Sequence, residues 1–159
     1  QKHGFNPEII TASRRVNEGM ANFVIDSMLR TMTREYSAVP KKIAILGVTF
    51  KENCPDIRNS HSFKLAEITN KLRINVDMFD PHASVDECRE HYNYEISNEF
   101  IVKSGYDCII FAVAHDCYKN YDERFFNELK ATGVKLIVDV KSIFSGINPL
   151  PEGIKIISL

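Results

Sequence analysis

The sequence predicts an α/β fold, in which a doubly wound, mainly parallel, Rossmann-like sheet is preceded by one long α-helix. From residue 42 onward, short segments that are almost continuously apolar alternate with segments of helical period. Strands of that kind are buried on both faces, as in a parallel sheet whose strands are joined through helices. Before residue 41 the chain instead holds one long stretch with apolar residues at helical spacing.

The long helix is expected over residues 6 to about 36. Asn6 can cap it, and Pro7 suits the first helical position. The apolar residues at helical spacing are Ile9, Ala12, Val16, Met20, Phe23, Val24, Met28 and Met32. Such a helix would be about 40 Å long, more than one small domain easily covers. We therefore expect residues 6–36 to be shared with another domain or a second subunit; packing on its own domain is the alternative.

The rest of the chain divides into alternating strands and helices. Residues 1–40 are expected to form the helix and a linker, and residues 41–159 the α/β domain. The strands are expected in KIAILGV, VDMFD, CIIFAVA, KLIVDV and IKIISL, which begin at residues 42, 76, 108, 135 and 154. Helices are expected at about 61–73, 84–91, 98–104 and 122–131. This alternation is typical of a doubly wound sheet.

Composition excludes several classes of function. The formal charge of -1 and the isoelectric point near 6.6 provide no basic field for nucleic acid. No apolar run approaches the roughly 20 residues of a membrane span, and no secretory signal is visible. The four cysteines form no CxxC pair, which favours reduced thiols and a cytoplasmic protein. His82, Cys88 and His91 follow no firm zinc motif, so no metal site is expected.

The loop after the first strand of the sheet is the strongest candidate site. It spans Thr49–Asn59 in the stretch ILGVTFKENCPDIRNSHS and lacks the GxGxxG dinucleotide pattern. In open α/β sheets, ligands bind at the carboxyl ends of the strands. Lys51 and Arg58, close to the start of the next helix, suit an anion such as a nucleotide. Alternatively the loop is simply solvated, and Arg58 pairs with Asp56 or Glu52.

Each of the other candidate residues near this edge has both a functional and a structural interpretation. Cys54 invites a nucleophile interpretation, for which Lys51 or Arg58 would have to lower the thiol pKa. Asp80 ends a strand where dinucleotide folds place a ribose-binding acid, but before Pro81 it equally suits a turn cap. His115 and Asp116 either line the cleft or form a hydrogen-bonded pair in the loop. Sequence reasoning favours the structural role for Cys54 and for the His115–Asp116 pair.

The amino-acid sequence of this loop also resembles a motif of a known family. GVTFKENCPDIRNS is similar to the motif that opens the C-terminal domain of the UDP-glucose/GDP-mannose dehydrogenase family. The ENCPDIRN version most resembles the bacterial enzymes that oxidise UDP-N-acetylhexosamines for surface polysaccharides. GFNPEIITASRRVNEGMANFV resembles the central helix of the family, VDMFDP its second C-terminal strand, and IVDVKSIF its late strand and turn.

The resemblance implies an NAD-dependent oxidoreductase that oxidises the sugar C6 alcohol to a carboxylate in two steps through a cysteine. By this matching, Phe50 and Lys51 contact the UDP-sugar, and Lys141 is a further basic residue at the cleft. Arg58 faces the NAD pyrophosphate. Residues 6–36 correspond to the helix that joins the subunits of a homodimer.

The sequence departs from the family pattern in two places. It contains neither the GxGxxG that binds NAD nor the GGxC segment with the catalytic cysteine, and it begins without Met. The resemblance therefore implies a C-terminal substrate-binding and dimerising part, with no catalytic residue of its own and with NAD bound mainly by another domain. The alternative is a stand-alone nucleotide-binding or oligomerisation module. A receiver domain is disfavoured, because Thr49, Phe50 and Lys51 stand where it needs acidic residues.

Overall fold

The computed structural model describes the backbone of residues 7–103, 105–146 and 152–159, with side chains from residue 19 onward. The capping role expected for Asn6 lies outside the described residues. The helices are α1 (Pro7–Tyr36), α2 (Ser62–Lys71), α3 (Val85–Tyr92), α4 (Asp116–Lys119) and α5 (Glu123–Ala131). The strands are β1 (Lys42–Leu46), β2 (Asn75–Phe79), β3 (Ile96–Ser97), β4 (Cys108–Phe111), β5 (Leu136–Asp139) and β6 (Lys155–Ser158).

The strands form one parallel sheet in the order β3-β2-β1-β4-β5-β6. From β1 the chain first builds outward through β2 to β3, and then returns to β4 on the other side of β1 and continues to β6. This is the doubly wound arrangement, and its strand order reverses between β1 and β4. The predicted fold class is confirmed.

Side chains of the strands alternate between two apolar cores, because successive residues of a strand point to opposite faces. On β1, Ile43 and Ile45 enter the core beneath α1, α2 and α3. Ala44 and Leu46 enter the core beneath α4 and α5. The central strands are fully buried on both faces, which accounts for their uninterrupted apolar sequence.

Two of the helices begin with side-chain caps that the sequence encodes. The Ser84 hydroxyl accepts a hydrogen bond from the Glu87 N–H at the start of α3. The Asp122 carboxylate accepts one from the Phe125 N–H at the start of α5. A cap of this kind stabilises a helix by about 1 kcal/mol, which helps helices of eight and nine residues to form.

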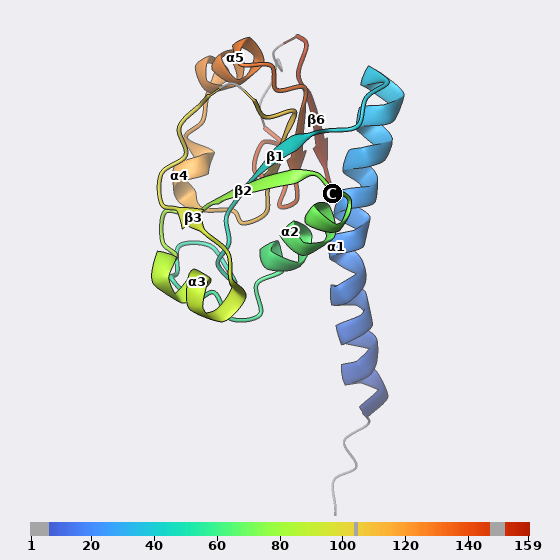
Figure 1. Ribbon diagram of the computed structural model, residues 1–159, viewed down its shortest axis with the longest axis vertical. Coiled ribbons are helices and arrows are strands. Elements are labelled where there is room, and N and C mark those ends of the chain that lie inside the picture. Colours follow the sequence, from blue (N-terminus) through green and yellow to red (C-terminus); the bar gives the residue numbers. More distant parts are fainter. Residues whose placement is uncertain (1–6, 104, 147–151) are drawn as a thin grey trace, which may run out of the picture.

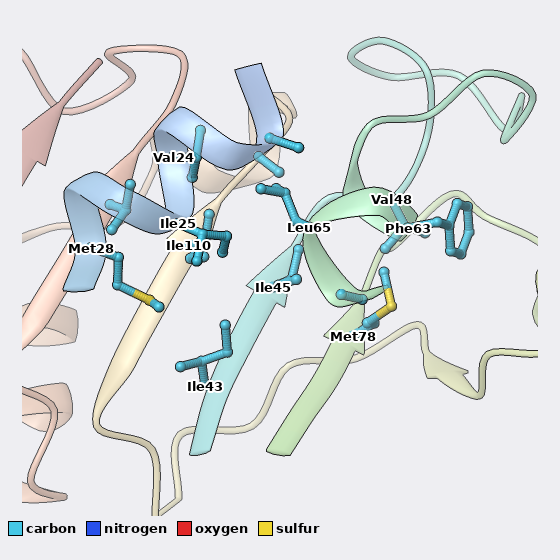
Figure 2. Close-up of a cluster of buried hydrophobic side chains, with 14 of the residues drawn as sticks. Val24, Ile25, Met28, Ile43, Ile45, Val48, Phe63, Leu65, Met78 and Ile110 are labelled. Carbon is cyan, nitrogen blue, oxygen red and sulfur yellow. The ribbon is translucent and has the colours of Figure 1, made fainter. Parts of the chain in front are cut away.

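α1 packs on α2 and on β5, and its N-terminal part extends beyond the α/β domain (Figure 1). Its side chains buried in the first core, several of them drawn in Figure 2, are Ala21, Val24, Ile25, Met28 and Met32. Met20 and Phe23, from the same expected apolar stripe, are 44% and 55% exposed. The C-terminal half of α1 is thus part of the domain core, and an adjoining strip of apolar surface stays open.

The prediction of a helix over residues 98–104 is wrong for the residues that the structure describes, because residues 98–103 form no regular element. The Asn98 side chain donates to the carbonyls of Asp80 and Ala83, both over 2.8 Å. Phe100 packs edge-on against Phe79, with ring centroids 5.0 Å apart. These contacts hold the segment as an irregular connection. The short elements β3 and α4 were not predicted.

In the part of the chain that the structure describes, no helix is both long and apolar enough to cross a bilayer.

Candidate functional site

The reversal of strand order brings two loops together at the carboxyl edge of the sheet. The loop after β1 runs from Gly47 to His61, and the β4 strand leads into Ala112 and Val113 beside it. Gly47 has a φ of +93°, and a Cβ there would lie 2.6 Å from Val113 Cβ and 2.8 Å from Val113 N. Only glycine fits this close approach. The first turn of the loop is therefore held directly against the end of β4.

A cavity of about 240 Å³ opens at this edge. The loop after β1, the start of α2 and the ends of β4 and β5 form its walls, and α1 closes one side. Most of the lining side chains are apolar, including Met20, Ala21, Val24 and Leu65. The charged residues of the lining are Lys51, Glu52 and Lys141. An apolar cavity with a few charged groups is the usual form of a small-molecule site.

Phe50, Lys51 and Lys141 were singled out from the sequence, and all three line this cavity. Lys51 and Lys141 come from loops that follow β1 and β5, separated by 90 residues in the chain but joined at one edge of the sheet. Neither lysine forms an ion pair with a described residue. Phe50 is 56% exposed, unusual for a phenylalanine. The arrangement offers two positive charges and an aromatic ring to a ligand.

Arg58 lies outside this cavity, in a neighbouring shallow pocket that it shares with Phe50, Asp56 and Asn59. Its guanidinium donates to both carboxylate oxygens of Asp56, over 2.9 and 2.8 Å. These hydrogen bonds from Arg58 lower the pKa of Asp56 to about 2. The pairing named as the alternative for Arg58 is therefore present. The pair is exposed, so its charge is also screened by solvent.

Asp80, at the end of β2, caps several turns at once. The Val48 and Thr49 N–H groups donate to its Oδ2 over 2.6 and 3.1 Å. The His82 and Ala83 N–H groups donate to its Oδ1 over 2.8 and 3.0 Å. The side chain has no exposed surface. Because both oxygens are occupied and buried, Asp80 is not available to a ribose hydroxyl, and it holds the turns around it.

His115 follows β4 and connects Asp80 to the loop after β1. Its Nε2 lies 2.9 Å from Asp80 Oδ2, and the Asn53 N–H donates to its Nδ1 over 3.0 Å. Since Nδ1 accepts a hydrogen bond it carries no proton, and Nε2 is the nitrogen that donates to Asp80. Burial alone would raise the pKa of Asp80, but hydrogen bonds led by that from His115 outweigh it and lower the pKa to about 2.

Thr49, His115 and Asp80 have the residue types of a hydrolytic triad, but their geometry does not form one. Thr49 Oγ1 and Asp80 Oδ2 both approach the same imidazole nitrogen, at 3.3 and 2.9 Å. A triad needs the nucleophile and the acid on opposite nitrogens. All three side chains are also buried. The cluster is therefore a hydrogen-bonded support for the loop.

A second contact fastens the same loop to the start of α4. The Asn53 amide donates to Asp116 Oδ2 over 2.7 Å, and the Asp116 N–H donates back to Asn53 Oδ1 over 3.0 Å. The sequence had offered His115 and Asp116 as a hydrogen-bonded pair. They are bonded instead to the loop after β1, which sequence reasoning missed.

The remaining candidates from the sequence do not gather into a reactive site. The Cys54 thiol donates to the carbonyl of Lys51, and all four cysteines are free. Cys88 is buried in the core, whereas His82 and His91 are exposed. Across the described side chains, no three His, Cys, Asp or Glu residues are placed to hold a metal ion.

With this geometry established, comparison with known proteins gives the family. Residues 44–146 match the UDP binding domain of the UDP-glucose/GDP-mannose dehydrogenase family. The chain belongs to this family. The matched region includes the loop after β1 and the ends of β4 and β5, and so covers every cavity-lining residue except those of α1.

Relatives in the family are nucleotide-sugar dehydrogenases. The chain is 40% identical over 117 residues to UDP-N-acetyl-D-glucosamine 6-dehydrogenase of Salmonella typhi, covering 73% of this chain and 27% of the relative. It is 32% identical over 139 residues to UDP-N-acetyl-D-mannosamine dehydrogenase of Methanococcus maripaludis, covering 87% and 31%. The structure of UDP-D-ManNAc dehydrogenase from Pyrococcus horikoshii superposes with a TM-score of 0.74 at 25% identity, over 99% of this chain and 34% of that one. The chain spans about a third of the length of these relatives.

Proposed function

We propose that this chain is the substrate-binding and dimerising part of an NAD-dependent nucleotide-sugar 6-dehydrogenase. The observation that carries the proposal is the cavity at the carboxyl edge, where Phe50, Lys51 and Lys141 meet in a domain of the UDP-binding type. The substrate would be a UDP-N-acetylhexosamine or UDP-glucose, converted to the uronic acid in two successive oxidations. We place this reaction in polysaccharide biosynthesis in the cytoplasm, where unpaired cysteines stay reduced.

The chemistry of the cavity suits a nucleoside diphosphate. Two ammonium groups, Lys51 and Lys141, balance the charge of a diphosphate, and an ammonium acts on phosphate as a mobile point charge. Phe50 provides an exposed ring for a planar base or the face of a sugar. The apolar wall from α1 and α2 offers the ligand a surface to cover beside the two exposed ammonium groups.

The sheet of this chain lacks the features with which a dinucleotide-binding fold holds NAD. The sequence has no second glycine close to Gly47, so the backbone cannot approach a pyrophosphate as GxGxxG allows. Asp80, in the place of a ribose-binding acid, is buried and fully bonded. NAD, which accepts the hydride in each oxidation, would then be bound mainly by another domain. In this proposal Arg58, exposed at the outer edge, is the residue that faces it.

The proposed homodimer forms through residues 6–36. Support comes from the apolar side chains that α1 leaves open beside the cavity, with Met20 and Phe23 about half exposed. Phe50 adds a third such side chain at the cavity. Large apolar side chains that stay exposed together are typical of a surface that a partner covers.

The test is to measure the binding of UDP to this chain by ligand-observed NMR, with ATP and NAD as competitors. We expect specific binding of UDP that Lys51→Ala and Lys141→Ala each weaken about tenfold, the size of one charge-assisted contact. Lys64→Ala is the matched control, because Lys64 lies outside the cavity and pairs with Glu67. Equal weakening by the Lys64 variant, or no UDP binding by the wild-type chain, would contradict the proposal.

A further inference from the structure

Residues 49–53 carry Phe50 and Lys51 into the cavity, yet they belong to no helix or strand. Their backbone is held by hydrogen bonds to groups elsewhere in the domain. At one end the Thr49 N–H donates to the buried Asp80 carboxylate. At the other end the Asn53 N–H donates to the His115 ring. The two lining side chains lie between these fixed ends.

The holding groups come from both halves of the sheet. Asp80 follows β2, His115 follows β4, and the loop that they hold follows β1. His115 is bonded directly to Asp80, so the three segments form one connected network. Within the loop, the Thr49 hydroxyl donates to the carbonyl of Lys51 over 3.0 Å and approaches His115 Nε2. A shift of the imidazole would therefore be transmitted to the residue that carries the charge.

Neither holding residue touches the cavity. Asp80 and His115 have no exposed surface, and neither is among the residues that line the cavity. Their direct contacts are with the loop, whose residues 49–52 line the cavity. A binding group that is already fixed loses less conformational freedom when its ligand arrives, and the affinity is higher for that reason.

Resting on the proposed nucleotide-sugar function, we infer that Asp80 and His115 are positioning residues for ligand binding. They hold residues 49–53 in the conformation in which Phe50 and Lys51 line the cavity, and so raise the affinity for a nucleoside diphosphate.

The first test is a double-mutant cycle with UDP as the probe. His115→Phe keeps a ring of similar size and loses both hydrogen bonds, and we expect UDP to bind about tenfold more weakly. His115→Gln can still donate to Asp80, and we expect it to recover part of the affinity. In the Lys51→Ala background, His115→Phe should weaken binding by less than about threefold, because the charged contact of the two through which it acts is already lost. A full additive loss would overturn the inference.

A control variant is needed to separate an effect on UDP affinity from a general loss of stability. Phe126→Leu removes atoms from a fully buried ring in the second core, which contains no residue of the loop after β1. We expect it to lower the unfolding temperature of the chain with the affinity for UDP unchanged, whereas His115→Gln lowers the affinity. Parallel losses of affinity in both variants would mean that His115 acts only on general stability, and would overturn the inference.

A second test needs no ligand and distinguishes this inference from the proposed function. In the wild-type chain the Asn53 amide should be protected from hydrogen exchange by its bond to His115. His115→Phe should speed its exchange at least about tenfold and leave the amide of Ile45, inside β1, unchanged. Absence of UDP binding by the wild-type chain would refute the proposed function alone. An Asn53 amide that exchanges equally fast in both proteins would refute the inference.

Discussion

At the scale of single residues, Asp80 is a carboxylate that the domain keeps charged in its interior. Asp80 has no contact with solvent, and it accepts four backbone hydrogen bonds as well as that of His115. Burying a charge is costly unless donors replace the lost water. Because five donors do so here, Asp80 connects the ends of β1, β2 and β4 instead of binding a ligand.

The hydrogen bonds that Asp80 accepts predict a loss of stability in acid. The folded protein lowers the pKa of Asp80 from 3.8 to about 2. Its contribution is therefore complete above about pH 4 and is lost as the pH falls toward 2, amounting to about 2 kcal/mol. Urea unfolding over that pH range should show a smaller decrease for Asp80→Asn than for the wild type. The variant should also be less stable at pH 7, because its amide group faces backbone N–H donors.

Asp56→Asn is the control for this measurement. Hydrogen bonds from Arg58 also lower the pKa of the Asp56 carboxylate to about 2, but this direct ion pair lies at the surface, where solvent screens it. Its removal should change the stability at pH 7 much less than Asp80→Asn does. Equal losses in the two variants, or identical acid profiles for wild type and Asp80→Asn, would contradict the account of the buried charge.

The positions of Phe50, Lys51 and Lys141 at one edge were predictable from the sequence, whereas the support beneath them was not. A loop that follows a buried strand lies at the carboxyl edge of any doubly wound sheet, so the strand pattern alone indicates where these residues stand. The bond between Asp80 and His115 depends on which strands are neighbours, and two residues 35 positions apart in the sequence give no sign of it. The role of the lining residues in binding stays a prediction.

At the scale of elements, α1 has two kinds of apolar surface. Val24, Ile25 and Met28 are buried in the domain core (Figure 2), whereas Met20 and Phe23 are exposed. The sequence pattern predicted the helix and its apolar stripe, but periodicity cannot tell which side the domain covers. That division depends on how α1 lies across α2 and β5.

The two surfaces of α1 should respond differently to substitution. Met28→Ala should lower the free energy of unfolding by about 2 to 5 kcal/mol, because it leaves a cavity in the core. Phe23→Ser should leave that free energy nearly unchanged and shift a dimer toward monomer. Sedimentation over a concentration series, together with urea unfolding, measures both effects. A wild-type chain that stays monomeric, or a Phe23 variant that dimerises equally well, would contradict the proposed dimer.

For residues 98–103 the sequence pattern predicted a helix that the structure does not contain. Phe100, Ile101 and Val102 form a short apolar run, which fits a short helix or an extended segment equally well. Here tertiary contacts decide, because the second core takes up Phe100 and Val102, and Asn98 bonds to the turn after β2. Short segments depend on such partners more than on their own propensity.

At the scale of the whole molecule, the fold was predictable because its strands are uniformly apolar and its helices alternate with them. The pattern does not contain the order of the strands, yet this order brings Lys51 and Lys141 from distant segments to one cavity. The participation of α1 in that cavity was likewise not evident, because the helix precedes the domain by sequence. The candidate site is thus assembled from three loops or strand ends, which follow β1, β4 and β5, and two helices, α1 and α2.

The most direct test of the account is to map the UDP site by backbone amide shifts in NMR spectra of this chain. We expect the largest changes at residues 49–52, 61–62, 112–113 and 140–141, which together border the cavity. The groove lined by Phe63, Tyr92 and Tyr94 on the α2–α3 side provides an internal comparison, and the chemical shifts of its amides should not change. Shifts centred on that groove, or none at saturating UDP, would contradict the central claim that the carboxyl-edge cavity holds the nucleotide.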